Sequence, residues 1–146
     1  VLALESIQDP GNLGTIIRLC DWFGIQNIIC SSDTVDCYNP KVVRSTMGSL
    51  ARVQVIYKEL ESWLMEVKDY QIVATSMTGQ SIYEHNFDTP TVLLIGNEGR
   101  GLSKQLTALS NKTLSIPRFG GAESLNAAMA TGIILAEARR NTSTEK

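Results

Sequence analysis

The chain has 146 residues, of which 43% are apolar and 19% are charged, as in an ordinary folded domain, and this excludes an intrinsically disordered protein. A net charge of −2 does not by itself indicate a protein that binds nucleic acid, and no apolar run approaches the roughly 20 residues of a membrane span. The three cysteines form no CxxC pair and there is a single histidine, so we expect neither a disulfide framework nor a metal site, and a reducing, cytoplasmic location without membrane association.

Short apolar strands alternate with helical patterns along the chain. We predict strands at residues 1–7, 26–30, 53–57, 71–75, 91–95 and 114–116. We predict helices at residues 13–23, 39–48, 60–67, 103–109 and 124–140, where apolar residues recur at helical spacings. Turns are expected at residues 9–12 and 78–79, irregular structure at residues 80–89, and a polar tail at residues 141–146. The alternation predicts one α/β domain, with a mostly parallel sheet and helices on both faces.

Three turns follow predicted strands, which is where open α/β sheets bind ligands. They cover residues 9–18, 96–101 and 116–126. The middle turn is rich in glycine but is neither a GxGxxG nor a P-loop sequence, and its Glu98 would repel a phosphate. This turn therefore suits a neutral or cationic ligand better.

The last predicted helix is poor in charge until Glu137. Ser124 is a suitable N-cap, because its hydroxyl can accept from a free amide of the first turn. The small and apolar residues that follow predict a helix that is buried on most sides. A polar Ser-x-Asn turn at the mouth of such a helix indicates a functional site.

Three segments carry a resemblance to a known family. They are DPGNLGTIIR at 9–18 (motif 1), LLIGNEGRGLS at 93–103 (motif 2) and IPRFGGAESLNAAMA at 116–130 (motif 3), and NPKVVRSTMGSLARV at 39–53 resembles the family's stretch between the first two. In this order and spacing they resemble the SpoU/TrmH family of RNA methyltransferases, within the SPOUT superfamily. The resemblance extends over about residues 2–140.

The resemblance implies a C-terminal deep trefoil knot, although chains rarely thread loops. It also implies a homodimer that transfers a methyl group from S-adenosylmethionine to a ribose 2′-hydroxyl of tRNA or rRNA, with S-adenosylhomocysteine as product. We expect residues 1–146 to form a single SPOUT catalytic domain. Many relatives carry an N-terminal RNA-binding domain, and because the chain begins at Val1 we expect such an extension to be absent from it.

The resemblance also places the cofactor. The implied pocket comprises Thr75, Gly96, Ile116 and Leu125, with Gly101 and Ala130 as neighbours. Adenine needs a flat apolar slot with backbone donors and acceptors, and the two glycines would let the backbone approach closely. Without the motif, simple core packing would be the preferred account of Ile116 and Leu125.

The family's polar catalytic set falls on Asn12, Arg18, Glu98, Ser124 and Asn126. Taken alone, Asn12 is equally a turn residue, Ser124 a helix cap and Arg18 a solvated helix residue. Arg18 lies among apolar neighbours and needs an anionic partner, either phosphate or Glu98. The family assigns proton removal to this arginine, but a guanidinium is a poor base, and holding an RNA phosphate and stabilising alkoxide charge fits it better. Ser124 and Asn126 would then orient the ribose or the arginine, and Asn12 would support its loop.

The candidates for RNA phosphate contacts are Lys41, Arg44, Arg100 and Arg118. Arg44 is favoured because it lies in the family-like stretch, although a solvated charged face explains each of these residues equally well.

Three other functions stay open: a base-methylating SPOUT enzyme, a non-catalytic RNA-binding or dimerisation module, and a generic nucleotide-binding domain. The nucleoside that is methylated, or the absence of cofactor binding, would distinguish them.

Overall fold

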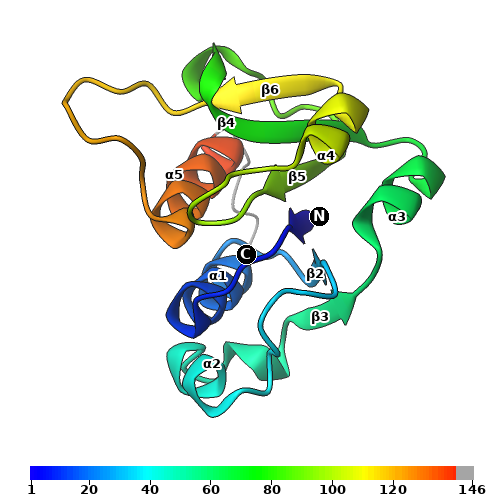
Figure 1. Cartoon of the computed structure of the whole chain (residues 1–146), viewed down its shortest axis with the longest axis vertical. Helices are drawn as coiled ribbons and strands as arrows, with labels where there is room; N and C mark the ends of the chain where they lie inside the picture. Colours follow the sequence, from blue (N-terminus) through cyan, green and yellow to red (C-terminus); the bar gives the residue numbers. More distant parts are fainter. Residues whose placement is uncertain (141–146) are drawn as a thin grey trace.

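The computed structural model describes residues 1–140, so the predicted tail at residues 141–146 lies outside the described part. Strands and helices alternate as predicted (Figure 1). They are β1 (Leu2–Leu4), α1 (Pro10–Trp22), β2 (Asn27–Cys30), α2 (Pro40–Ser45), η1 (Ser49–Ala51), β3 (Gln54–Tyr57), α3 (Leu60–Glu66), β4 (Gln71–Ser81), η2 (Ile82–Glu84), β5 (Thr91–Ile95), α4 (Lys104–Leu109), β6 (Lys112–Ser115) and α5 (Ala127–Arg139). None of the helices up to residue 140 has the length and hydropathy that a bilayer span requires.

The six strands form one sheet in the order β3-β2-β1-β5-β4-β6, and every strand pairing within it is parallel. Leu2 of β1 lies opposite Ile28 of β2 on one side and Leu93 of β5 on the other. This confirms the predicted α/β class with a parallel sheet.

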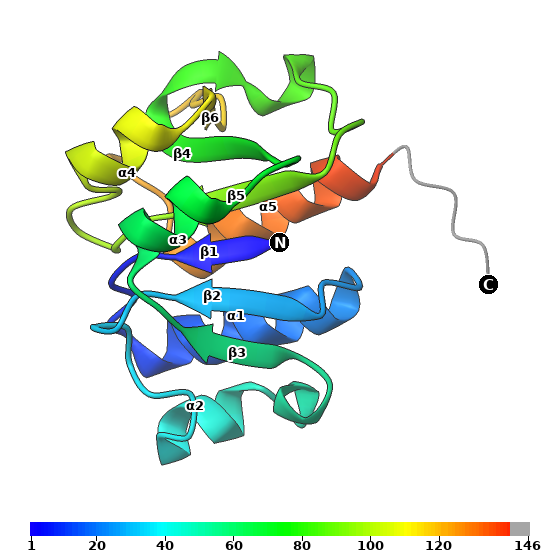
Figure 2. The same cartoon turned by 90° about the vertical axis from the view of Figure 1, so that its right-hand side faces the viewer.

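Alternate residues of the central strands enter two separate cores. Leu2 and Leu4 of β1 point into a cluster with the buried faces of α1 and α5, whereas Ala3 packs with Leu60 of α3 and Leu106 of α4. Figure 2 shows the sheet between these layers, with α3 and α4 on one side and α1, α2 and α5 on the other. Burial on both faces explains why these strands are continuous apolar runs.

The chain changes direction across the sheet between β1 and β5. It first builds β1, β2 and β3 outward, and then crosses to the other half for β4, β5 and β6. Such a switch point opens a crevice at the carboxyl ends of the two central strands. Motif 1 follows β1 and motif 2 follows β5, so the two motifs meet at this crevice.

The first helix begins earlier than predicted. Asp9 is its N-cap, with Oδ1 accepting from the Asn12 backbone N–H at 2.8 Å, and Pro10 occupies the first position. Asn12 therefore lies in the first helical turn, and the prediction of a separate turn at residues 9–12 was wrong. The strand before it also ends at Leu4 instead of residue 7.

Strand β4 continues to Ser81, so the predicted strand end at Thr75 and turn at residues 78–79 were wrong. Both Thr75 and Gln80 lie opposite Leu114 of β6, and the four residues between them form an irregularity in the pairing. A Cβ on Gly79 would come within 2.6 Å of the Thr113 carbonyl oxygen. Residues 78–79, whose sequence favours a turn, therefore form part of a bulge in β4, because β6 pairs with β4 on both sides of them.

Helix α5 begins at Ala127 and is capped by Asn126, so the prediction that Ser124 caps it was wrong. The Asn126 Oδ1 accepts from the backbone N–H groups of Ala128 and Met129 at 2.9 and 3.2 Å. Of the residues of α5, only Met129, Ala136 and Arg139 are exposed, and the others are buried or half-buried. This agrees with the expected burial of the helix on most sides.

Candidate active site

Three side chains, one from each motif, are joined in a row by two hydrogen bonds. The Asn12 Nδ2 donates to Glu98 Oε1 at 3.1 Å, and the Asn126 Nδ2 donates to Asn12 Oδ1 at 2.8 Å. Asn12 is at the centre and is only 8% exposed. We call this row of hydrogen-bonded side chains the Glu98–Asn12–Asn126 relay. It joins the starts of α1 and α5 to the turn after β5.

The chemistry at the two ends fixes the direction of every amide in the relay. The Glu98 carboxylate accepts from Asn12, whose Nδ2 must therefore face it. At the other end, backbone N–H groups of α5 donate to the Asn126 Oδ1, which leaves the Asn126 Nδ2 to face Asn12. The two asparagines therefore have one consistent orientation, and neither can be replaced by aspartate without losing a donor.

The Glu98 carboxylate accepts hydrogen bonds from two of the motifs. Besides Asn12, its carboxylate accepts from the backbone N–H groups of Gln8 at 3.4 Å and Asp9 at 3.2 Å, and from Asn97 Nδ2 at 3.4 Å. Four N–H donors thus converge on its two oxygens. The carboxylate therefore ties motif 1 to motif 2.

The turn after β5 closes on itself. Asn97 and Gly101 exchange two backbone hydrogen bonds, at 3.1 and 2.9 Å, and Gly101 has a φ of 69°. A Cβ on Gly96 would lie 2.2 Å from the Gly101 carbonyl carbon, so only glycine fits there. Asn97 also donates from Nδ2 to the Ser6 carbonyl oxygen at 2.7 Å. Asn97 was missed at the sequence level, although its place between Gly96 and Glu98 in the turn was a usable signal.

The other residues expected at the cofactor come from β4, from the loop that follows β6 and from the start of α5. Thr75 is half-buried on β4, and its Oγ1 donates to the Leu94 carbonyl oxygen at 2.8 Å. Ile116 directly follows β6 and is half-buried, and Leu125 is 50% exposed. Ala130 lies in the first turn of α5.

The segment from Ile116 to Leu125 has free backbone groups. Within residues 1–140, none of its N–H or carbonyl groups makes a hydrogen bond with another backbone group. Its Ala122 carbonyl oxygen accepts only from the Arg118 Nη1, at 3.2 Å. Free donors and acceptors next to the partly exposed side chains of Ile116 and Leu125 suit a flat heteroaromatic ring.

Arg18 of motif 1 and Ser124 of motif 3 have no side-chain partners among the described residues. Both side chains are exposed, and neither makes a hydrogen bond or ion pair with any residue between 1 and 140. The suggestion that Glu98 is the partner of Arg18 is therefore wrong, because the carboxylate is occupied by N–H donors. A phosphate remains the anion for which Arg18 is available.

The four residues expected to contact RNA phosphates are all exposed: Lys41, Arg44, Arg100 and Arg118. Arg44 makes one bond, from Nε to the Pro40 carbonyl oxygen at 3.3 Å. None of the four forms an ion pair in the described part of the chain. Lys41 and Arg44 both lie on α2, whereas Arg100 and Arg118 belong to motifs 2 and 3.

Nucleophilic and metal chemistry find little support elsewhere in the molecule. Burial raises the pKa of both Cys20 and Cys30 to about 12, so neither thiol is an accessible nucleophile. Over residues 1–140, no group of three histidine, cysteine or acidic side chains is placed to hold a metal ion. The relay and the three turns around it are the best-defined candidate site.

The chain resembles known proteins over nearly its whole length. Residues 1–136 match the SpoU rRNA Methylase family. The chain belongs to this family. All three residues of the relay therefore lie within the part that matches the SpoU family.

Two curated relatives show the extent of the likeness. An uncharacterised tRNA/rRNA methyltransferase of Synechocystis is 39% identical over 145 residues, which cover 95% of this chain and 52% of that protein. A 23S rRNA (guanosine(2553)-2′-O)-methyltransferase of Bacillus subtilis is 34% identical over 138 residues, which cover 92% of this chain and 56% of that protein. The chain thus spans about half the length of these relatives.

A solved structure shows the same fold. The AdoMet-bound rRNA methyltransferase of Sinorhizobium meliloti is 39% identical and superposes with a TM-score of 0.92, covering 98% of this chain and 56% of that one.

Proposed function

We propose that this chain is the catalytic part of an S-adenosylmethionine-dependent enzyme that methylates a ribose 2′-hydroxyl of rRNA or tRNA. The observation that carries the proposal is the Glu98–Asn12–Asn126 relay, which assembles all three SpoU motifs at the switch point of the sheet. The names of the relatives support the substrate class, and the AdoMet-bound Sinorhizobium meliloti structure supports the cofactor.

The free backbone groups of residues 116–125 fit an adenine ring, with Ile116 and Leu125 as apolar walls. The proposed cofactor pocket is completed by Thr75 of β4, by Gly96 and Gly101 of the turn after β5, and by Ala130 of α5. Gly96 acts indirectly, since its missing side chain lets the turn after β5 close. The bound sulfonium supplies an activated methyl group, so the chain needs to contribute alignment more than chemistry.

In this proposal the relay residues are positioning residues. They fix the N-termini of α1 and α5 relative to the turn after β5, and they hold the cofactor loops in one arrangement. Arg18 binds the phosphate next to the target ribose and stabilises the charge that develops on its 2′-oxygen. Ser124, exposed and unbonded in the described chain, orients the ribose through its hydroxyl.

We further propose that two copies associate through the α1–α5 face. Trp22 is 84% exposed on α1, Met129 is exposed on the adjacent α5, and Arg18 lies on the same outer face of α1 as Trp22. Exposed apolar side chains on neighbouring helices are typical of an interface.

The trefoil knot is also part of the proposal, formed where residues 116–126 cross from the edge strand β6 back to α5 beside α1 (Figure 1). Residues 1–140 would then be one catalytic domain, and the RNA-binding part of longer relatives would be a separate unit.

The deciding experiment combines two measurements on the purified chain. Calorimetric titration with S-adenosylhomocysteine tests the pocket, with a dissociation constant near micromolar expected, about −8 kcal/mol. Transfer from tritiated S-adenosylmethionine to total rRNA and tRNA, followed by digestion to nucleosides, identifies the product. A 2′-O-methylated nucleoside supports the proposal, a base-methylated one replaces it by the base-modifying alternative, and a folded chain that binds no cofactor leaves the non-catalytic alternative.

A further inference from the structure

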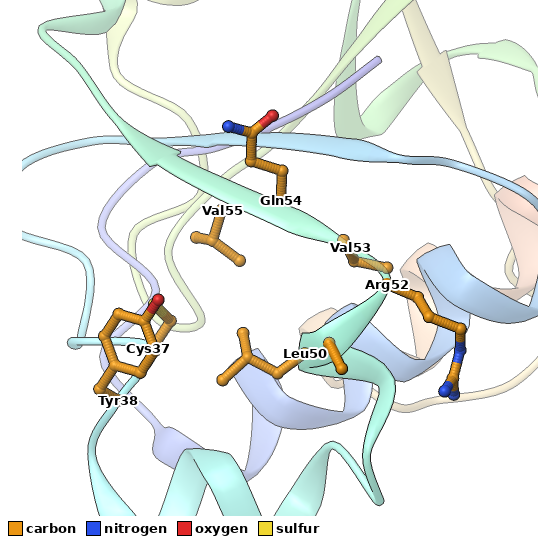
Figure 3. A pocket seen from close by; sticks show the side chains of 8 residues that line it. Cys37, Tyr38, Leu50, Arg52, Val53, Gln54 and Val55 are labelled. Carbon is orange, nitrogen blue, oxygen red and sulfur yellow. The ribbon is translucent and has the colours of Figure 1, made fainter.

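A hollow lies at the edge of the sheet, away from the motifs. It has a volume of about 370 Å³ and opens between the loop before α2, the η1 turn and the edge strand β3. Its lining residues are Cys37, Tyr38, Leu50, Ala51, Arg52, Val53, Gln54 and Val55. Figure 3 shows Tyr38, Leu50 and Val55 facing the same gap, whereas Arg52 points away from it.

Tyr38 offers an exposed aromatic face on a fixed backbone. Its side chain is 74% exposed. The preceding Cys37 backbone N–H donates to the Tyr57 hydroxyl at 2.8 Å, and that hydroxyl donates to the Val35 carbonyl oxygen at 2.7 Å. The Tyr38 backbone N–H itself donates to Asp36 Oδ1 at 3.0 Å. The aromatic ring is thus presented by a pre-organised loop, which lowers the entropy cost of binding.

Two unpaired cationic side chains, Lys41 and Arg44, lie on α2, which begins two residues after Tyr38. Two other basic residues of this region do not add to them, because Lys58 lines a different hollow and Arg52 has an acidic partner. Arg52 is held by Asp21, with a shortest N–O distance of 2.6 Å. Lys41 and Arg44 are exposed and form no ion pair with any described residue. An anionic partner would therefore meet a local cationic surface on an otherwise acidic protein.

We propose that this hollow binds an unpaired base of the RNA substrate, which stacks on Tyr38 while its flanking phosphates contact Lys41 and Arg44. Stacking on an exposed aromatic ring beside cationic side chains is the usual chemistry of single-stranded RNA recognition. The inference rests on the proposed function and extends it to a second contact. Because β3 lies two strands from β1, this contact is separate from the relay and selects the RNA without touching the reacting ribose.

The test is RNA binding by fluorescence anisotropy, with fluorescein-labelled 12-nucleotide oligouridylate and oligoadenylate as probes. We expect Tyr38→Ala to weaken binding about 10-fold, which is in the range of one lost stacking contact. Tyr38→Phe keeps the ring and should stay within about twofold of the wild type. Tyr83→Ala, at an exposed tyrosine of η2 in the other half of the molecule, is the matched control and should also bind normally.

The phosphate contacts have a separate readout. The double variant Lys41→Gln/Arg44→Gln should reduce the slope of log affinity against log salt by about 1.4, because each single-strand phosphate contact contributes about 0.7. Tyr38→Ala should leave this slope unchanged. These two effects together distinguish a stacked base from a general electrostatic attraction.

Titration of each variant with S-adenosylhomocysteine separates this inference from the proposed function. Reduced RNA affinity of Tyr38→Ala with unchanged cofactor affinity supports the RNA contact. A Tyr38→Ala chain that binds RNA like the wild type, or a wild type that binds cofactor but neither oligonucleotide, overturns it. A Tyr38→Ala variant that changes only the sedimentation behaviour would make the hollow a protein contact and would also overturn it. Loss of cofactor binding by the wild type itself would instead refute the proposed function.

Discussion

The Asn12→Asp substitution tests the relay most directly, because it changes the chemistry of one atom and not its size. In the native chain the Asn12 Nδ2 donates to Glu98 Oε1 at 3.1 Å. The substitution replaces this donor by a carboxylate oxygen, so two acidic groups face each other. Asn126 can still donate to the other oxygen of residue 12, and only one hydrogen bond of the relay is broken.

The expected cost follows from the geometry. A lost hydrogen bond to a charged group costs about 1.5–3 kcal/mol. Two unit charges 3.1 Å apart would add about 5 kcal/mol at an effective dielectric constant of 20. Proton uptake limits this cost, since keeping a carboxyl of ordinary pKa near 4 protonated at pH 7 requires about 4 kcal/mol and restores an O–H···O bond. We therefore expect the free energy of unfolding to fall by about 4 kcal/mol at pH 7.

The stability of the Asn12→Asp variant should depend on pH, because residue 12 and Glu98 would share a proton. Because the facing carboxyls have a raised pKa in the folded variant, its stability relative to the wild type is lost as the pH rises and recovers as the pH falls. At pH 5 the difference should shrink to about 1 kcal/mol, since each pH unit changes it by at most about 1.4 kcal/mol.

The assay is urea unfolding of wild type and variants at pH 5, 6 and 7, with the m-value checked for constancy. Asn111→Asp is the matched control, because the one hydrogen bond of that side chain is accepted by Oδ1 from the Ile72 N–H at 2.7 Å, which a carboxylate can also accept. If Asn12→Asp destabilises no more than Asn111→Asp, or shows no recovery at low pH, Glu98 and Asn12 are not coupled as described.

Three further predictions concern separate features. Gly96→Ala should lower the free energy of unfolding by about 3 kcal/mol or more, because its Cβ would lie 2.2 Å from the opposite backbone of the turn. The control Gly120→Ala meets no atom within 4 Å and should change the free energy of unfolding by less than about 0.5 kcal/mol. Equal urea midpoints of the two variants would contradict this. Burial lowers the pKa of His85, so the unfolded chain takes up a proton first and the wild type should lose stability as the pH falls from about 7.5 to about 5.5, a loss that His85→Phe removes. A slope that persists in this variant would assign it to other groups. Arg18→Ala should lose methyl transfer by about 100-fold or more while its affinity for S-adenosylhomocysteine stays unchanged, and normal methylation would exclude the catalytic role of Arg18.

Much of the fold follows from local patterns in the sequence. Asn39 followed by Pro40 predicts the start of α2, and the structure confirms it, with Asn39 Oδ1 accepting from the Lys41 N–H. A glycine at residue 24 predicts the end of the first helix, and Gly24 indeed follows the C-cap with a φ of 71°. These features depend only on backbone conformations and hydrogen bonds within a few residues, which is why sequence alone predicts them.

Two of the errors occur where distant segments decide the local structure. A serine and an asparagine both suited the start of α5, and only Asn126 caps it, because its Nδ2 is also bound by Asn12 from motif 1. Strand β4 continues past its turn signal because β6 pairs with it again beyond the bulge. No window of neighbouring residues contains this information.

The sequence by itself determined the parallel α/β class, the order of the elements and the three motifs that place this chain in the SpoU family. Only the tertiary structure decided that the Glu98 carboxylate ties motif 1 to motif 2, that Arg18 is left unpaired among the described residues, and that Asn12 joins motifs 86 and 114 residues away. The reason is physical: a residue type specifies which hydrogen bonds a side chain can make, but only the folded chain determines which partners come within reach.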